Sequence, residues 1–150
     1  MADLPKSLLS EVSWCFALES PQSREDMLWD ASFFASFMDL KDPRWVLERP
    51  LPFSDVRLRY EYGRRPERRW SEYYDEEEEE EFESWRPQEA EVRIVAGPLS
   101  VLTGADLLWD LHLAITPRIF ECEGHFLEAL ELESPGGEGE PPTYRVVLAA

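Results

Sequence analysis

Cysteine and basic residues are scarce in this sequence, and each shortage excludes a class of protein. The chain of 150 residues has only two cysteines, Cys15 and Cys122. Two are too few for a disulfide scaffold, and a single bridge would need them to meet in space, so a reduced, cytoplasmic setting is the simplest interpretation. Lys and Arg number 15 against 32 Asp and Glu, which gives a net charge of −17. Because nucleic acids and anionic membranes both attract basic surfaces, we expect neither as a partner.

Long apolar runs are also absent. The most apolar stretch, residues 33–38, is six residues long and contains Ser36, whereas a membrane-spanning helix needs about 20 residues. The N-terminal residues do not show a basic segment followed by an apolar one, so we expect no signal peptide. Apolar residues nevertheless make up 43% of the chain, too many for a wholly disordered polypeptide. We therefore expect one domain over residues 1–150.

A charged segment, residues 63–90, divides the chain. It holds 11 acidic and 5 basic residues and includes seven consecutive acids from Asp75 to Glu81. Such a run must face water or a cationic partner, so we expect a surface insertion with residues 71–83 outside the core. It is either a solvated loop or a docking element with aromatic anchors. In the second case the partner-binding residues are Trp70, Tyr73, Tyr74, Asp75, Glu76, Glu77, Glu78, Glu79, Glu80, Glu81 and Trp85.

The strongest local signal predicts a helix over residues 104–115. Thr103 is a good N-cap, and Asp106 stands three residues later as its partner in a capping box. Apolar residues then recur with helical spacing until Pro117, which ends the helix.

A second helix is predicted over residues 24–39. Ser23 precedes it in an S-x-x-D pattern, which is a helix start signal. The apolar residues that follow have the spacing of one helix face, and we expect two further phenylalanines to widen that face toward the core. The face is Met27, Ala31, Phe34 and Met38, widened by Phe33 and Phe37.

Alternating apolar and polar residues predict about five strands, at residues 11–18, 56–62, 92–96, 125–132 and 143–148. The strands come in clusters rather than in strict alternation with helices. This order favours an α+β fold with a mostly antiparallel sheet of about five strands and two main helices, 24–39 and 104–115.

Residues capable of catalysis or metal binding form no convincing motif. Cys122 and His125 have a C-x-x-H spacing, but a zinc site would need Cys15 and His112 as well, which are the other cysteine and histidine of the chain. His112 lies on a largely apolar helix, and we interpret it as a packed residue bonded to a backbone carbonyl. Phosphate-binding, metalloprotease, nucleophile-elbow and EF-hand patterns are all missing. We therefore expect no catalytic residue, no metal and no cofactor.

Acidity and aromatic content together favour a non-catalytic protein-binding module. In size and composition the chain is similar to immunity proteins and antitoxins, whose carboxylates neutralise a basic toxin or nuclease. Charge would steer the encounter, and aromatic anchors would supply short-range energy. The alternatives are an adaptor or structural subunit, and a small enzyme or ligand-binding domain. The last would require a pocket lined by Trp14, Trp45 or Trp109.

Overall fold

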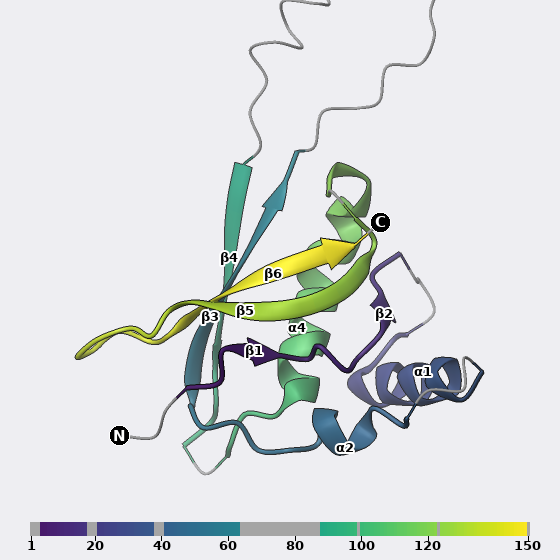
Figure 1. Ribbon diagram of the computed structural model, residues 1–150, viewed down its shortest axis with the longest axis horizontal. Coiled ribbons are helices and arrows are strands. Elements are labelled where there is room, and N and C mark those ends of the chain that lie inside the picture. Colours follow the sequence, from purple (N-terminus) through teal and green to yellow (C-terminus); the bar gives the residue numbers. More distant parts are fainter. Residues whose placement is uncertain are drawn as a thin grey trace, which may run out of the picture.

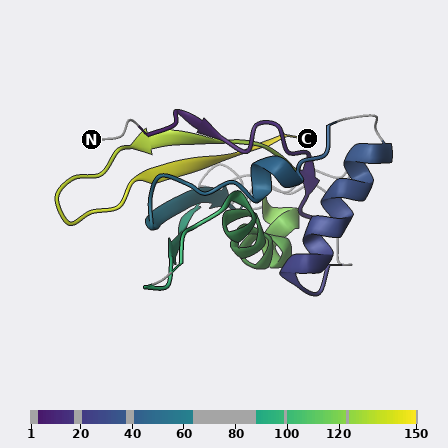
Figure 2. The ribbon, with the colours of Figure 1, turned by 90° about the horizontal axis from the view of Figure 1, so that it is seen from below.

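The computed structural model describes residues 4–17, 21–37, 41–63, 88–98, 100–122 and 124–149. A six-stranded sheet forms one layer, and helix α4 lies against one face of it (Figures 1 and 2). Helix α1 packs beside α4. The predicted α+β class with a mostly antiparallel sheet is confirmed. In the part of the chain described, no helix combines the length and apolar character needed to cross a membrane.

The sheet joins two hairpins through a parallel central pair. Its order is β1-β5-β6-β3-β4, with β2 also paired to β5. The β3–β4 and β5–β6 pairs are antiparallel, and β3 runs parallel to β6. Three of the predicted strands, 56–62, 125–132 and 143–148, are confirmed to within a few residues. The strands are β1 (Ser7–Leu8), β2 (Trp14–Cys15), β3 (Asp55–Tyr62), β4 (Gln88–Val95), β5 (Phe126–Ser134) and β6 (Thr143–Ala149).

The predicted strand over residues 11–18 is wrong in extent. Only β2 forms within it, and β1 pairs separately with the other end of β5. Between them the backbone turns at Leu9, whose φ of 59° is left-handed, and the Val12 amide donates to the Leu9 carbonyl. The alternation of apolar and polar residues nevertheless predicted the buried side chains correctly. Val12, Trp14 and Phe16 are almost completely buried.

Strand β4 begins earlier than the sequence predicted. It starts at Gln88, opposite Tyr62, rather than at residue 92. Residues 88–90, which we assigned to the charged segment, therefore belong to the sheet. The rest of that segment, residues 64–87, connects β3 to β4 and lies outside the described residues.

Helix α4 (Gly104–Ile115) has the predicted bounds and the predicted cap. The Thr103 side chain accepts from the Asp106 amide, and the Asp106 side chain accepts from the Thr103 amide. A 3-10 helix, η1 (Thr116–Glu121), continues from it, with Pro117 in its first turn. The residues facing the sheet are fully buried; they are Leu107, Leu108, Leu111 and Ile115.

Helices α1 (Arg24–Phe37) and α2 (Arg44–Leu47) complete the helical layer. Helix α2 approaches the start of α4 so closely that a side chain on Gly104 would not fit without movement. A Cβ atom there would lie 2.9 Å from the Leu9 Cδ2, 3.2 Å from the Val46 carbonyl oxygen and 3.3 Å from the Leu47 Cα. Helix α1 lies at one side of the molecule, and it contacts both α2 and α4 (Figure 1).

Candidate functional site

The predicted partner-binding residues, from Trp70 to Trp85, all lie outside the described residues. Their role stays a prediction. The surfaces that the structure does describe contain three other features that sequence reasoning did not identify as sites: an aromatic row on α1, a charged sheet face, and a groove beside β4.

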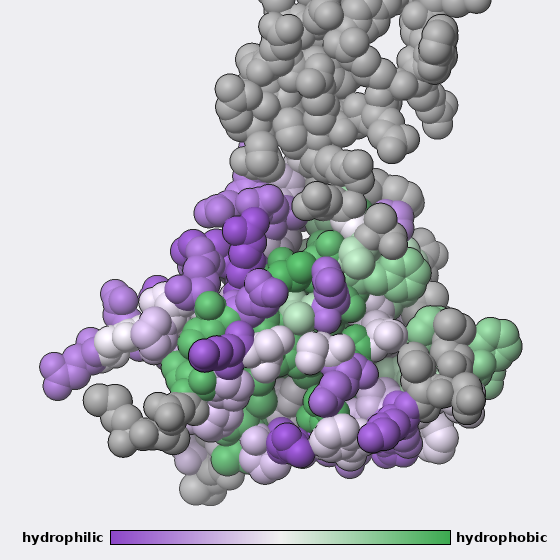
Figure 3. Space-filling model, viewed as in Figure 1, coloured by the Kyte–Doolittle hydropathy of each residue, from purple (hydrophilic) through white to green (hydrophobic). Residues whose placement is uncertain are grey.

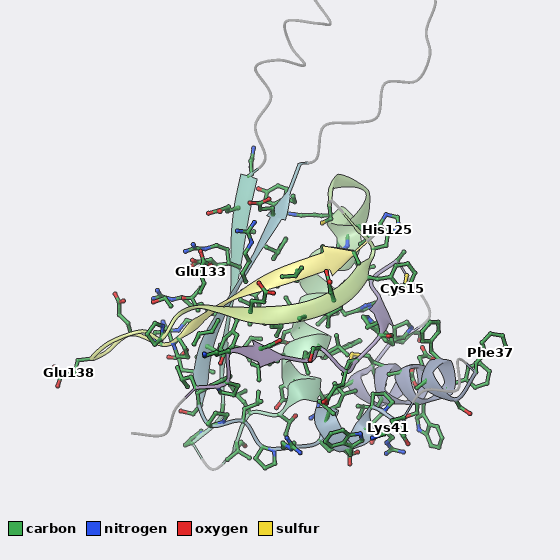
Figure 4. The ribbon with its side chains drawn as sticks, viewed as in Figure 1. Cys15, Phe37, Lys41, His125, Glu133 and Glu138 are labelled. Carbon is green, nitrogen blue, oxygen red and sulfur yellow. The ribbon has the colours of Figure 1, made fainter. Side chains whose placement is uncertain are left out.

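Helix α1 carries a row of exposed aromatic side chains, which we call the aromatic stripe: Trp29, Phe33 and Phe37. They are 67%, 74% and 78% exposed. A spacing of four residues places them on one side of the helix. Figure 4 shows Phe37 projecting from the end of the helix away from the body of the molecule, and Figure 3 shows hydrophobic side chains gathered at this end.

The prediction that Phe33 and Phe37 widen the core face of this helix is wrong. The buried side has the same four-residue spacing but is offset by two residues, and it consists mainly of Met27, Ala31 and Ala35. Small side chains let α1 approach its neighbours closely, so the alanines face inward and the bulkier phenylalanines remain outside. The helix has more apolar residues than its core contact can cover.

Arginines from the α2 region lie over two tryptophan rings, one of them in the stripe and the other on α2. The Arg44 guanidinium is 5.5 Å from the ring centroid of Trp29, and that of Arg49 is 5.1 Å from the ring centroid of Trp45. These distances are within the range of cation–π attraction. Trp45 is itself 46% exposed. The aromatic surface therefore continues from α1 onto α2.

Asp42 fixes the start of α2 against α1. Its carboxylate accepts a hydrogen bond from the Ser32 hydroxyl at 2.9 Å and from the Arg44 amide at 3.0 Å. Because Ser32 is on α1 and Arg44 opens α2, this side chain links the two helices, which also contact each other and α4. The aromatic surface is thus preorganised, which lowers the entropic cost of binding.

The solvent-facing side of the sheet is a network of ion pairs. Hydrophilic residues gather over β3 and β4 in Figure 3. Hydrogen bonding to Arg93 holds the pKa of Asp55 below its usual range. Since these arginines already face carboxylates, this surface is largely self-neutralised. The pairs are Arg93–Asp55, Arg59–Glu91, Arg59–Glu133 and Arg145–Glu61, with N···O distances of 2.7, 2.9, 3.0 and 3.2 Å.

A groove of about 270 Å³ lies between the end of β4 and helix α4, and we call it the β4 groove. Val95 and Val101 are 60% and 62% exposed at its margin, and Trp109 and Asp110 line it from α4. Burial, and then the neighbouring charge of Asp106, raise the pKa of Asp110.

The two aspartates of the β4 groove differ in their partners. Asp106 belongs to the capping box and forms an ion pair with Arg24 at 3.2 Å. Asp110 forms no hydrogen bond or ion pair within the described ranges. The groove therefore combines apolar margins with one carboxylate that has no cation beside it.

His112 is enclosed by aromatic rings in the core. Its Nδ1 accepts from the Trp14 indole N–H at 3.2 Å, and the Trp109 ring stacks on it at a centroid distance of 5.8 Å. Burial lowers the pKa of His112. The Thr116 hydroxyl oxygen also lies 3.2 Å from Nδ1, so the neighbours of this nitrogen are two side chains and not the backbone carbonyl that we expected.

We expected a ligand pocket, if one is present, to be lined by Trp14, Trp45 or Trp109, and one of the three, Trp109, does line a groove. Trp14 is buried in the core, Trp109 lines the β4 groove and Trp45 is exposed on α2. Neither Cys15 nor Cys122 takes part in a disulfide bond. Within the described ranges, no three His, Cys, Asp or Glu side chains are grouped as metal ligands.

In the part of the chain that the structure describes, two surface features are suited to binding: the aromatic stripe with its arginines, and the β4 groove with the carboxylate of Asp110. Comparisons of the chain with protein-family models, with curated proteins and with solved structures find no match.

Proposed function

We propose that this chain is a non-catalytic binding protein for a basic protein, acting as an inhibitor of the immunity-protein or antitoxin type. The aromatic stripe is the observation that carries the proposal. Interface centres are enriched in tryptophan and other aromatic residues, and contiguous exposed apolar patches mark interaction sites. Trp29, Phe33 and Phe37 are each more than 65% exposed on a helix whose opposite side already packs against the core.

The size of the stripe indicates what it can contribute to binding. Aromatic side chains bury about 150–250 Å² each, so covering the three exposed fractions removes on the order of 400 Å² from water. At about 25 cal/mol per Å² this is worth about 10 kcal/mol. Association itself costs about 4–15 kcal/mol. The stripe therefore supplies an anchor, and a tight complex needs a second favourable contribution.

Charge can supply that second contribution, and it also selects the partner. The net charge of −17 repels a second copy of the chain and attracts a cationic protein over a distance of about 8 Å at physiological salt. Electrostatic complementarity of this kind raises the association rate and suppresses binding to acidic proteins. A basic toxin or nuclease is the class of partner that best fits an acidic protein with a preorganised aromatic anchor.

Affinity capture from lysate of the source organism tests the proposal. The bait variants are Phe33→Ser combined with Phe37→Ser, and Leu113→Ser as a matched control that removes a 55% exposed apolar side chain from α4. We expect the wild type and the control to retain one basic protein in stoichiometric amount, and the double variant to lose it. Binding should abolish that protein's activity.

The kinetics give a second readout. We expect association to slow several-fold from low to physiological salt, because screening shortens the reach of the carboxylates, while dissociation changes less. Capture of an acidic protein, capture that is indifferent to the stripe, or turnover of a substrate by the purified chain alone would contradict the proposal.

A further inference from the structure

Strand β4 forms a long edge of the sheet. Within the described ranges its only neighbour is β3 (Figures 1 and 2). The Ala96 amide donates to the Ser54 carbonyl at 2.8 Å, which fixes the alternation of the antiparallel pair. The even-numbered residues of β4 therefore direct their backbone groups toward β3. The odd-numbered residues Glu89, Glu91, Arg93 and Val95 direct theirs toward the open edge.

An open edge of this length is a template for another strand. Of the eight residues of β4, the four odd-numbered ones present a row of N–H and C=O groups with no strand partner in the described part of the chain, and this row can form a new antiparallel or parallel pair. Proteins use such edges to bind extended peptides, where main-chain hydrogen bonds give affinity and side-chain pockets give specificity. Here the row ends beside a pocket, because Val95 is both the last residue of β4 and part of the β4 groove.

The β4 groove lies where alternate side chains of an added strand would point. Successive residues of a strand face opposite sides of the sheet, so every second residue would face α4. On that side stand Trp109 and the carboxylate of Asp110. Val101 adds an exposed apolar margin.

We propose that the β4 edge and the β4 groove together bind an extended basic peptide segment, which adds to the sheet as a further strand and places a lysine or arginine beside Asp110. This inference goes beyond the proposed function, because it concerns a different surface and would stand if the aromatic stripe bound nothing.

Charge complementarity identifies the occupant as basic. Asp106 is already paired with Arg24, and Arg93, the cation on β4, is paired with Asp55. Asp110 has no such partner in the described part of the chain. A cation from outside would therefore complete the groove, whereas an acidic segment would place like charges against Asp110, Glu89 and Glu91. Edge pairing between two copies would also bring together two chains of charge −17.

Peptide binding to the full chain tests the charge requirement. The probes are two synthetic peptides of equal length, one alternating valine and lysine and the other alternating valine and glutamate. We expect the lysine peptide to bind at least about tenfold more tightly, and Asp110→Asn to weaken it by about tenfold, because hydrogen bonds to charged groups are worth that much. Equal binding of the two peptides, or no binding of the lysine peptide, would overturn the proposal.

Hydrogen exchange tests the pairing itself, residue by residue. With the lysine peptide bound, the outward amides of Arg93 and Val95 should gain protection, whereas the inward amides of Val92 and Ile94 should already be protected without it. Protection that rises with protein concentration in the absence of peptide would assign the edge to a second copy and overturn the proposal.

Two substitutions at one position separate strand pairing from side-chain contact. Val95→Pro removes an outward N–H without removing a hydrogen bond to β3, and should abolish binding. Val95→Thr keeps the amide and the shape, and should bind normally. Binding that survives Val95→Pro, or that is lost equally in both variants, would show that no strand is added. The Phe33→Ser, Phe37→Ser variant should bind the peptide like the wild type, which keeps this test independent of the aromatic stripe.

Discussion

Protonation of His112 should destabilise the fold, because the structure holds this residue neutral. Its side chain is almost completely buried, and burial lowers its pKa. The indole N–H of Trp14 can only donate, so Nδ1 of His112 must carry a lone pair to accept it. Adding a proton to Nδ1 would place two N–H groups against each other in the core.

The expected size of the effect follows from linkage. In the unfolded chain the histidine titrates near its ordinary pKa of 6.5, whereas in the native state its pKa is lower. As the pH falls below 6.5 the unfolded chain takes up a proton that the native state does not, so the free energy of unfolding decreases. The loss between about pH 7.5 and 5.5 is at most about 1.4 kcal/mol, which is the limit for a native histidine that takes up no proton in this range.

Urea denaturation of the wild type and of His112→Asn at the two pH values measures this loss. The asparagine carbonyl can accept the Trp14 N–H but does not titrate. The many carboxylates of the chain titrate in both proteins and cancel in the comparison. We expect the stability advantage of the wild type to shrink at the lower pH, by no more than about 1.4 kcal/mol. An advantage that stays constant between the two pH values would refute the claim that His112 is held neutral.

Three further predictions concern stability. Thr103→Ala should lower the free energy of unfolding by about 0.5–2 kcal/mol through loss of the cap, and an unchanged urea midpoint would contradict this. Leu111→Ala should lower the free energy of unfolding by about 2–5 kcal/mol because Leu111 is fully buried. The control Leu113→Ala, at a side chain that is 55% exposed, should lower it much less. Equally small shifts of the thermal midpoint in the two variants would contradict the burial of Leu111. Burial raises the pKa of Tyr144 to about 12, and its hydroxyl donates to the Pro5 carbonyl. The stability that this group contributes is therefore present below pH 10 and is lost as the pH rises toward 12. Tyr144→Phe should remove a phenolate transition near pH 12 from the absorbance titration, and an unaltered titration would contradict the assignment.

Elements whose determinants are local could be predicted from the sequence. Helix α4 is bounded by its own capping box and by Pro117, all within about four residues of its ends. Strand β3 shows its buried and wet sides in the alternation of Val56 and Leu58 with Arg57. Such signals need no knowledge of the rest of the fold.

Features that depend on distant neighbours could not be predicted in the same way. The apolar residues of α1 outnumber what one face can bury, and only the packing decides that Ala31 goes inside and Phe33 outside. The β4 groove joins Val95 to Asp110, which belong to different elements. Nothing in the local sequence of Glu89 to Arg93 indicated that β4 would be the last strand of the sheet.

The two edges of the sheet are unequal, and this limits how the protein can assemble with itself. One edge is broken into β1 and β2 by the left-handed turn at Leu9, whereas β4 is continuous over eight residues. Growth of a filament by strand pairing requires each molecule to offer two usable edges, one for the preceding subunit and one for the next. With a single continuous edge in the described part of the chain, edge-to-edge association ends at a closed pair. The turn at Leu9 thus leaves β4 as the one continuous edge among the described residues, and it adds a geometric barrier to filament growth to the barrier that the net charge already provides.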